Sequence, residues 1–198
     1  MQSYCVSEFL KNIYSLCITK ITWKRARLIR RPCYIRGKSS IYGGNGLTTG
    51  YSCRFDLPGK KITLEIGDNC EFGDNTHIVA LQKVIIGSNV LLASKVFISD
   101  TNHGKYKGVG QDSPFTKPNV RELVYSSVHI GNNVWIGENV VVLAGSEIGD
   151  GCIIGANSII SDKIPPYSIV VGCNRIIKRY DESECCWKKI DEKRGKQK

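Results

Sequence analysis

The residue best suited to chemistry in this chain is His103, which stands in the stretch Asp100-Thr-Asn-His103-Gly104. An imidazole has a reference pKa of about 6.5, so near neutral pH it can take a proton from a poor nucleophile such as an alcohol. A lone histidine in a loop is by itself more often an ordinary surface residue. Asn102 and Asp100 could orient the imidazole or bind a substrate, and the same residue types also suit a simple turn. What His103 does therefore depends on the elements that hold it.

An aliphatic residue recurs every six positions through the second half of the chain. These anchor residues are Ile130, Ile136, Val142, Ile148, Ile154 and Ile160. The position four beyond each anchor is small or β-branched: Val134, Val140, Ser146, Cys152, Ser158 and Ile164. The same period occurs earlier at Ile66, Phe72 and Ile78, and resumes after a slip of two at Ile86, Leu92 and Ile98. A six-residue period fits neither a helix nor a long strand, and indicates a short strand and a turn, repeated.

This period predicts a solenoid in which each hexapeptide forms one side of a triangular coil. The anchors point inward and stack about 4.8 Å apart on successive turns. Asparagine takes the tight corner conformations that most residues resist, and the corner asparagines are expected to be Asn69, Asn75, Asn89, Asn133, Asn139 and Asn157. Residues 104–127 have no period, so we predict a protruding loop there. His103 lies where that loop begins, and a loop held on a rigid scaffold often carries function.

Four stretches resemble one known family. They are Ile130-Gly-Asn-Asn-Val-Trp-Ile-Gly137, Ile148-Gly-Asp-Gly-Cys-Ile-Ile-Gly-Ala-Asn-Ser158, Ile164-Pro-Pro166 and Asp100-Thr-Asn-His103. They resemble the hexapeptide-repeat acyltransferases, and among these the sugar and bacterial polysaccharide O-acetyltransferases. The resemblance implies an all-β fold, a left-handed parallel β-helix, a homotrimer, acetyl-CoA as the donor and active sites between neighbouring subunits. The handedness rests on the resemblance alone, because most β-crossovers are right-handed.

The resemblance also implies roles for individual residues. His103 matches a catalytic histidine, with Asn102 beside it, and Trp135 matches a tryptophan that lines the donor–acceptor site, although packing is its usual role. Glu138 matches a position whose backbone N–H stabilises the oxyanion, but its side chain is larger than the one often found there. The other matched positions are Ala156, Ser161, Arg175 and Lys178 for acetyl-CoA, and Asn75, His77 and Asp100 for the acceptor. Plain corner or surface roles remain the alternatives for these residues, and His129 is expected to be structural.

We therefore expect direct acetyl transfer to a sugar hydroxyl of a cell-surface polysaccharide, of O-antigen or capsule type, or its precursor. One alternative is an N-acetyltransferase acting on an amino-sugar nucleotide, and a less favoured one is a non-catalytic scaffold. A zinc lyase of the γ-carbonic-anhydrase type needs three histidines, two of them five apart. The three histidines here lie 26 residues apart each time, at positions 77, 103 and 129, so no metal is expected.

The nine cysteines show neither a CxxC pair nor another zinc spacing. Cys70 and Cys152 fall at repeat positions where small residues sit, which makes a covalent nucleophile less favoured there. Cys185 and Cys186 are too close for an easy intrachain disulfide. The pattern predicts reduced, mostly buried cysteines in a cytosolic protein.

The net charge of +10 is concentrated near the N-terminus, where residues 20–36 hold seven Lys and Arg residues and no acid. Such a segment favours anionic partners. No aromatic motif typical of nucleic-acid binding accompanies it, so nucleic acid is not an expected partner. The pattern of residues 8–31 is compatible with a helix. That helix either caps the end of the coil or lies on the inner face of an anionic membrane.

The chain is accordingly divided into three parts. Residues 1–34 form a basic, helical N-terminal segment, residues 35–172 form the β-helix with the loop 104–127, and residues 173–198 form a basic tail with a short helix. No stretch is apolar for the 18 or more residues that a membrane span needs, and residues 1–20 do not read as a signal peptide. We expect a cytoplasmic protein, with peripheral membrane contact through the basic segment as an additional feature.

Overall fold

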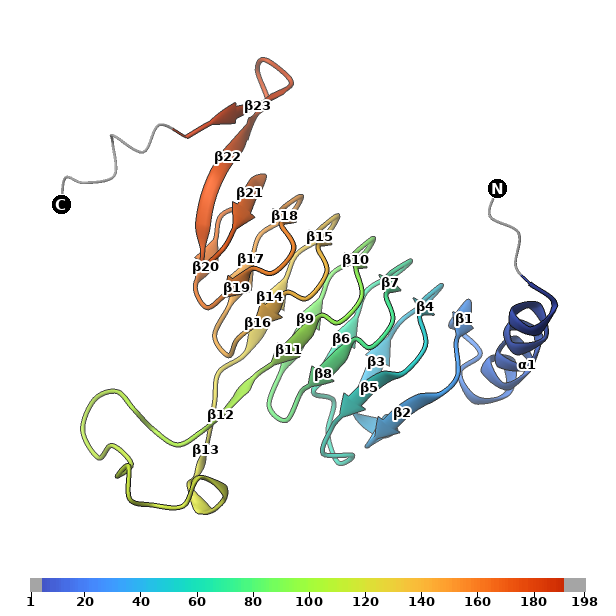
Figure 1. Ribbon diagram of the computed structural model, residues 1–198, viewed down its shortest axis with the longest axis horizontal. Coiled ribbons are helices and arrows are strands. Elements are labelled where there is room, and N and C mark those ends of the chain that lie inside the picture. The colour runs from blue at the N-terminus through green and yellow to red at the C-terminus, as the bar shows by residue number, and fades with distance from the viewer. Residues whose placement is uncertain (1–4, 191–198) are drawn as a thin grey trace.

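The computed structural model describes residues 5–190, which form a three-sided coil of short parallel strands (Figure 1). Face A contains β1 (Leu28–Ile29), β4 (Thr48–Thr49), β7 (Glu71–Phe72), β10 (Leu91–Leu92), β15 (Trp135–Ile136), β18 (Ile153–Ile154) and β21 (Ser168–Val171). Face B contains β2 (Cys33–Arg36), β5 (Cys53–Asp56), β8 (His77–Val79), β11 (Phe97–Ser99), β16 (Val141–Val142) and β19 (Ile159–Ile160). Face C contains β3 (Ile41–Gly43), β6 (Leu64–Ile66), β9 (Val84–Ile86), β14 (Val128–Ile130), β17 (Glu147–Ile148) and β20 (Lys163–Ile164). The coil thus completes six turns in the described residues, and β21 begins a seventh.

The six-residue period sets the core, as predicted. All six anchors from Ile130 to Ile160, and all six residues four positions beyond them, are at most 4% exposed. The strand register stacks isoleucine on isoleucine in successive turns. On face C, Ile86 pairs with Ile130, Ile130 with Ile148 and Ile148 with Ile164. Fully burying one such side chain stabilises the fold by about 1.5–3 kcal/mol, so the stack is a main source of stability.

The corners also follow the sequence pattern. All six predicted asparagines have a positive φ, between 55° and 59°. Gly137 is required for a different reason, since a Cβ at this position would lie 2.6 Å from the backbone nitrogen of Ala156 on the next turn. The next turn therefore leaves no room for a side chain at position 137.

The predicted loop leaves the coil between faces B and C (Figure 1). Its stem is an antiparallel pair, β12 (Thr101–His103) with β13 (Leu123–Tyr125), in which His103 faces Leu123. A short 3₁₀ helix, Pro118–Val120, lies within it, and another, Lys38–Ser40, precedes β3. The chain returns to the coil at β14, so the loop interrupts one turn without breaking the stack.

The two ends of the coil differ in detail from what the sequence suggested. Helix α1 (Val6–Thr22) ends well before residue 31, and β1 already begins the coil at Leu28. In place of the expected C-terminal helix, β22 (Arg175–Asp181) turns back along β21, and β23 (Cys186–Lys189) pairs with β22. The open edge of β21 offers unpaired backbone groups, which favour a strand over a helix here. Residues 191–198 lie outside the described residues.

Candidate functional site

His103 is the last residue of the strand that carries the chain out of the coil. The Gly104 N–H donates to the Glu122 carbonyl at 2.9 Å across the stem, and the Tyr106 hydroxyl donates to the His103 carbonyl at 2.5 Å. Arg121 Nη1 donates in turn to the Tyr106 hydroxyl at 2.6 Å. The His103 side chain is exposed, and no hydrogen bond to it is recorded among residues 5–190. The loop therefore fixes the backbone of His103 and leaves its imidazole open to a reactant.

Tyr106 and Arg121 were missed by the sequence analysis. Arg121 also donates from Nη2 to the Thr116 carbonyl at 2.7 Å, so it joins three points of the loop. Nothing in the residue pattern marks the pair, because they are 15 residues apart in a stretch without a period. The one weak signal in the sequence is that the loop beside His103 contains both an arginine and a tyrosine.

The Asp100 side chain has a clear structural task beneath this loop. Its buried carboxylate accepts hydrogen bonds from the backbone N–H groups of Leu81, at 3.0 Å, and of Gln82 and Lys83, both at 2.7 Å. Residues 81–83 lie where the hexapeptide frame slips by two. The carboxylate thus holds the irregular corner in place, and it points into the fold rather than toward the exposed imidazole.

His77 lies on the outer side of face B and forms part of a polar cluster. Its Nε2 is 2.9 Å from Asp56 Oδ2, and its ring packs against Phe97 with the centroids 5.2 Å apart. Arg54 Nε donates to the same Asp56 oxygen at 2.7 Å. Burial opposes ionisation of the Asp56 carboxyl, but the hydrogen bonds of His77 and Arg54 outweigh it and lower its pKa below the usual value. Asp56 lies 21 residues before His77, about one turn of the coil, and only the completed coil reveals the pair.

Three of the residues predicted to contact acetyl-CoA or the acceptor lie at the corner between faces A and B. Glu138 and Ala156 occupy this corner on successive turns, and the Asn157 N–H donates to the Glu138 carbonyl at 2.9 Å. Within the described residues, no hydrogen bond is recorded for the Glu138 N–H, which leaves it available to an incoming oxygen. Asn75 lies at the same corner two turns earlier than Glu138, exposed and with a φ of 58°.

On face A, a row of paired residues on successive strands runs from Trp135 to Lys178 near the C-terminus. Trp135 is 51% exposed and pairs with Leu91 on one side and Ile153 on the other. The row continues through Ile169 to Lys178 on β22. Trp135 and Lys178 therefore project from the same side of one sheet, with apolar residues between them. That arrangement suits an elongated ligand with an apolar arm and an anionic end.

Ser161 lies further round the coil, whereas Arg175 lies at the edge of face A. Ser161 sits at the corner between faces B and C, where its N–H donates to Asn174 Oδ1 at 2.9 Å and its hydroxyl accepts from Asn174 Nδ2 at 2.8 Å. Arg175 begins β22 opposite Val171. His103 is at the B–C corner and Trp135 is beside the A–B corner, so face B lies between them. One chain does not bring these two residues together.

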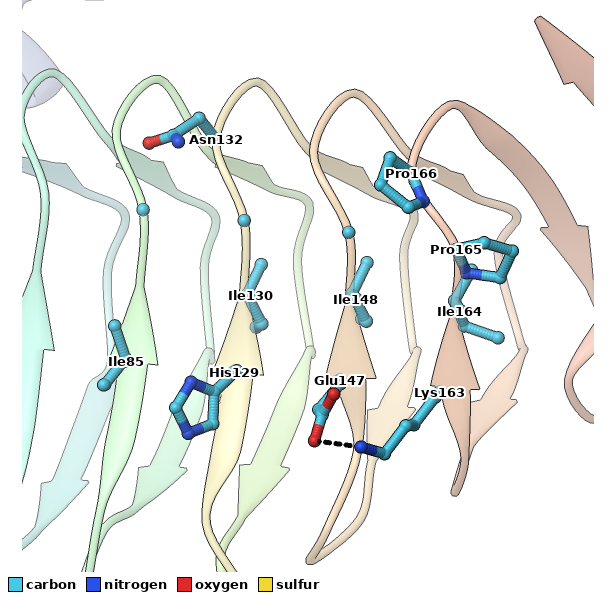
Figure 2. A pocket seen from close by; sticks show the side chains of 13 residues that line it. Ile85, His129, Ile130, Asn132, Glu147, Ile148, Lys163, Ile164, Pro165 and Pro166 are labelled. Atoms are coloured by element: carbon cyan, nitrogen blue, oxygen red, sulfur yellow. Dashed lines mark ion pairs between the residues drawn. The ribbon is translucent and has the colours of Figure 1, made fainter.

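A separate depression lies on face C (Figure 2). Its volume is about 740 Å³, and its lining includes His129, Ile85, Pro165 and Pro166. The ion pair between Lys163 and Glu147, at 2.8 Å, lies along one side. It contains none of the residues predicted to act in catalysis or binding. No group of three or more potential metal ligands occurs among residues 5–190.

The buried cysteines are suited to packing rather than to catalysis. All nine cysteines are free thiols: Cys53, Cys70 and Cys152 are buried, Cys33 is half-buried, and the other five are exposed. The prediction that most of them would be buried was wrong, because the exposed ones lie in the terminal segments outside the repeat. Burial is the main cause that raises the pKa of Cys70 and Cys152, and it raises that of Cys53 to about 12. A thiol must ionise to become a strong nucleophile. These buried thiols therefore remain protonated, which disfavours a covalent intermediate on them.

Comparison with known proteins places the chain among proteins of the same repeat. The family model described as bacterial transferase hexapeptide (six repeats) matches residues 127–162. WbbJ of Escherichia coli K12, a candidate lipopolysaccharide biosynthesis O-acetyl transferase, is 39% identical over 188 residues, which cover 94% of this chain and 95% of WbbJ.

Two solved structures share the fold. One is AntD, an N-acyltransferase from Bacillus cereus in complex with dTDP and 3-hydroxybutyryl-CoA. It matches with a TM-score of 0.66 and 19% identity over 93% of either chain. The other is a galactoside acetyltransferase in complex with coenzyme A, with a TM-score of 0.58 and 24% identity over 97% of this chain and 94% of the other. These likenesses extend over nearly the whole chain and agree with the coil described above.

Proposed function

The chain belongs to the hexapeptide-repeat acyltransferases, and from this premise we propose that it acetylates a hydroxyl group of a sugar in a cell-surface polysaccharide or its precursor. It is an acetyltransferase that acts on sugars, with acetyl-CoA as the donor. The choice of a hydroxyl acceptor in an O-antigen or capsule type of polysaccharide is carried by one observation, the similarity to WbbJ along 94% of the chain. We place the reaction in the cytoplasm, where acetyl-CoA is supplied.

In the proposed mechanism, His103 acts as a general base. It takes the proton of the acceptor hydroxyl as the oxygen attacks the thioester carbonyl. The Glu138 N–H stabilises the oxyanion of the tetrahedral intermediate. Collapse of this intermediate breaks the C–S bond, and the imidazolium returns its proton to the departing thiolate, which leaves as coenzyme A. The exposed imidazole and the Glu138 N–H, which has no recorded partner in residues 5–190, support this assignment.

The separation of His103 from Trp135 by face B supports a site between two chains. We propose a homotrimer in which His103 and Asn102 of one subunit face Trp135 of its neighbour. The donor would lie along Ala156 and Ser161, with its phosphates at Arg175 and Lys178. Asn75 and His77, the latter held by Asp56, would contact the acceptor. Asp100 supports the loop through its backbone bonds and acts by position rather than by contact.

The first test is isothermal titration of the purified protein with acetyl-CoA, with desulfo-CoA for comparison. Binding with a Kd of about 1–100 μM is expected, which is an ordinary range for a substrate. If acetyl-CoA and desulfo-CoA bind with similar affinity, the protein recognises the nucleotide and pantetheine parts of the donor rather than its thioester. A folded protein that binds neither would refute the proposal.

A second candidate function is transfer to an amino group of a nucleotide-linked sugar. The likeness to AntD along 93% of the chain favours it, although identity of 19% shows the fold alone. The two reactions are separated by transferring a labelled acetyl group to the acceptor and treating the product with alkali. Mild alkali releases acetate from an ester and leaves an amide intact, so loss of label under alkali is expected. Retained label would decide for N-acetylation.

The hydrogen bond from Tyr106 to the His103 carbonyl gives a prediction about the loop. Tyr106→Phe removes a hydrogen bond whose net contribution is about 1 kcal/mol, and kcat should fall about fivefold while the KM for acetyl-CoA stays constant. Steady-state kinetics measure both quantities. Tyr125→Phe is the matched control, since it lies on the same stem and its hydroxyl has no recorded partner among the described residues. Equal kcat values for the two variants would contradict the positioning role of Tyr106.

A further inference from the structure

Helix α1 presents an apolar face to solvent. Exposed apolar side chains lie along its outer side at Val6 (77% exposed), Phe9 (56%), Leu10 (59%), Ile13 (43%) and Ile21 (74%), and Cys17, also exposed, lies in the eight-residue gap between the last two. Tyr14 and Leu16 flank this row and are also exposed. Residues at this spacing share one side of a helix. Figure 1 shows α1 at the N-terminal end of the coil with β1 on one side, and no other helix or strand of the described chain on the far side.

The inner side of α1 is the polar one. Thr19 and Ser15 are fully buried, and their hydroxyls accept the backbone N–H groups of Ile29, at 2.9 Å, and Arg31, at 3.2 Å. Asn12 Oδ1 accepts from Arg30 Nε at 3.1 Å. Small polar residues thus attach the helix to the edge of the coil. A surface helix usually buries its apolar face, and here the pattern is reversed, so capping of the coil does not account for the outer side chains.

The surroundings of this face are strongly cationic. Residues 5–50 contain one acid, Glu8, and nine cations: Lys11, Lys20, Lys24, Arg25, Arg27, Arg30, Arg31, Arg36 and Lys38. The Glu8 carboxylate accepts the Cys5 N–H at 3.3 Å at the start of the helix. Lys11, Lys24 and Arg25 are exposed, and no ion pair is recorded for them among the described residues. An apolar face on a segment that carries these three cations complements a surface that is both apolar and anionic.

We propose that α1 binds the surface of an anionic lipid membrane. The helix lies in the plane of the interface, with the row from Val6 to Ile21 among the acyl chains and the neighbouring cations at the headgroups. Its 17 residues are apolar on one side only, and no helix in residues 5–190 has the length and hydropathy of a membrane span. A second copy of the helix is a poorer occupant, because it would bring two cationic segments together.

Flotation of the full-length protein with lipid vesicles tests the proposal. We expect binding to vesicles of phosphatidylcholine that contain phosphatidylglycerol, much weaker binding to pure phosphatidylcholine, and a decrease at high salt. The variant Leu10→Glu/Ile13→Glu should reduce binding about tenfold or more, because charges replace two inserted side chains. Val109→Glu/Phe115→Glu makes the same change of charge at two exposed apolar residues of the loop, and it should bind as the wild type does.

The outcomes are distinguishable. Absence of wild-type binding to the anionic vesicles would overturn the proposal. Equal losses in the two double variants would also overturn it, since the effect would then come from net charge alone. Thermal unfolding checks that each variant is folded, and sedimentation equilibrium measures its mass. A lower mass for Leu10→Glu/Ile13→Glu in the absence of lipid would assign the face to contact between copies instead. The assay does not involve turnover, so its result is independent of the proposed function.

Discussion

Alanine at position 103 is expected to lower kcat by about 10²–10⁴-fold, the usual contribution of a general base. The acceptor hydroxyl would keep its proton at the moment of attack, so the barrier to transfer would rise. Binding of acetyl-CoA should not change, because in the proposed arrangement His103 does not contact the donor's phosphates or pantetheine arm. Steady-state kinetics and isothermal titration measure the two quantities on the same preparation.

His129→Ala is the matched control for this experiment. His129 is exposed on face C, away from the residues proposed to act in transfer. The substitution removes the same side chain from the same kind of exposed position, and the variant should keep most of its turnover. If a folded His103→Ala protein turned over at the wild-type rate, the proton would have to go to another group, and the Asp56–His77 pair would be the first place to look.

Asp100→Ala should cause the largest loss of stability among the substitutions considered. The side chain is fully buried, and its removal leaves three backbone N–H groups without their acceptors. Each unsatisfied donor costs about 1–3 kcal/mol, so the free energy of unfolding should fall by at least about 3 kcal/mol. For a chain of this size, such a loss lowers Tm by roughly 10 °C, which differential scanning calorimetry detects easily.

Two further variants separate the structural role of Asp100 from contact with the acceptor. Asp162→Ala removes an exposed aspartate whose recorded bond is to the adjacent Lys163 N–H, and it should leave Tm nearly unchanged. Asp100→Asn keeps an oxygen acceptor but places an NH₂ group against N–H donors, so an intermediate Tm is expected. Kinetics well below the melting temperature should give a nearly normal KM for the acceptor in Asp100→Asn. A normal Tm with a raised KM would instead mean that the carboxylate meets the sugar.

The sequence was most informative where a period was present. The anchors from Ile130 to Ile160 and the corner asparagines are spaced by the geometry of the coil itself, so counting residues was enough to predict where they lie. The loop 104–127 was predictable for the opposite reason, because the period stops there. The left-handed sense of the coil was not predictable from spacing, since inward stacking looks the same along the chain for either hand. It followed from the family resemblance.

What the sequence could not supply were contacts between residues outside the repeat. The link from Arg121 through Tyr106 to His103 depends on how an aperiodic loop folds. Asp56 meets His77 because one turn of the coil separates them, and the length of that turn varies with its corners. The C-terminal strands form because β21 leaves an edge to pair with, which propensity within residues 175–189 does not reveal.

The turn-back of β22 and β23 has a consequence for how the molecule behaves at high concentration. A stack of parallel strands ends in open backbone groups, and these can template the next chain, as in a growing fibril. On face A the direction of pairing reverses after β21, and the outermost described strand carries Lys188 and Lys189. A second coil cannot continue the parallel register there, and like charges repel another edge. Face A at this end of the solenoid is thereby protected from end-to-end pairing.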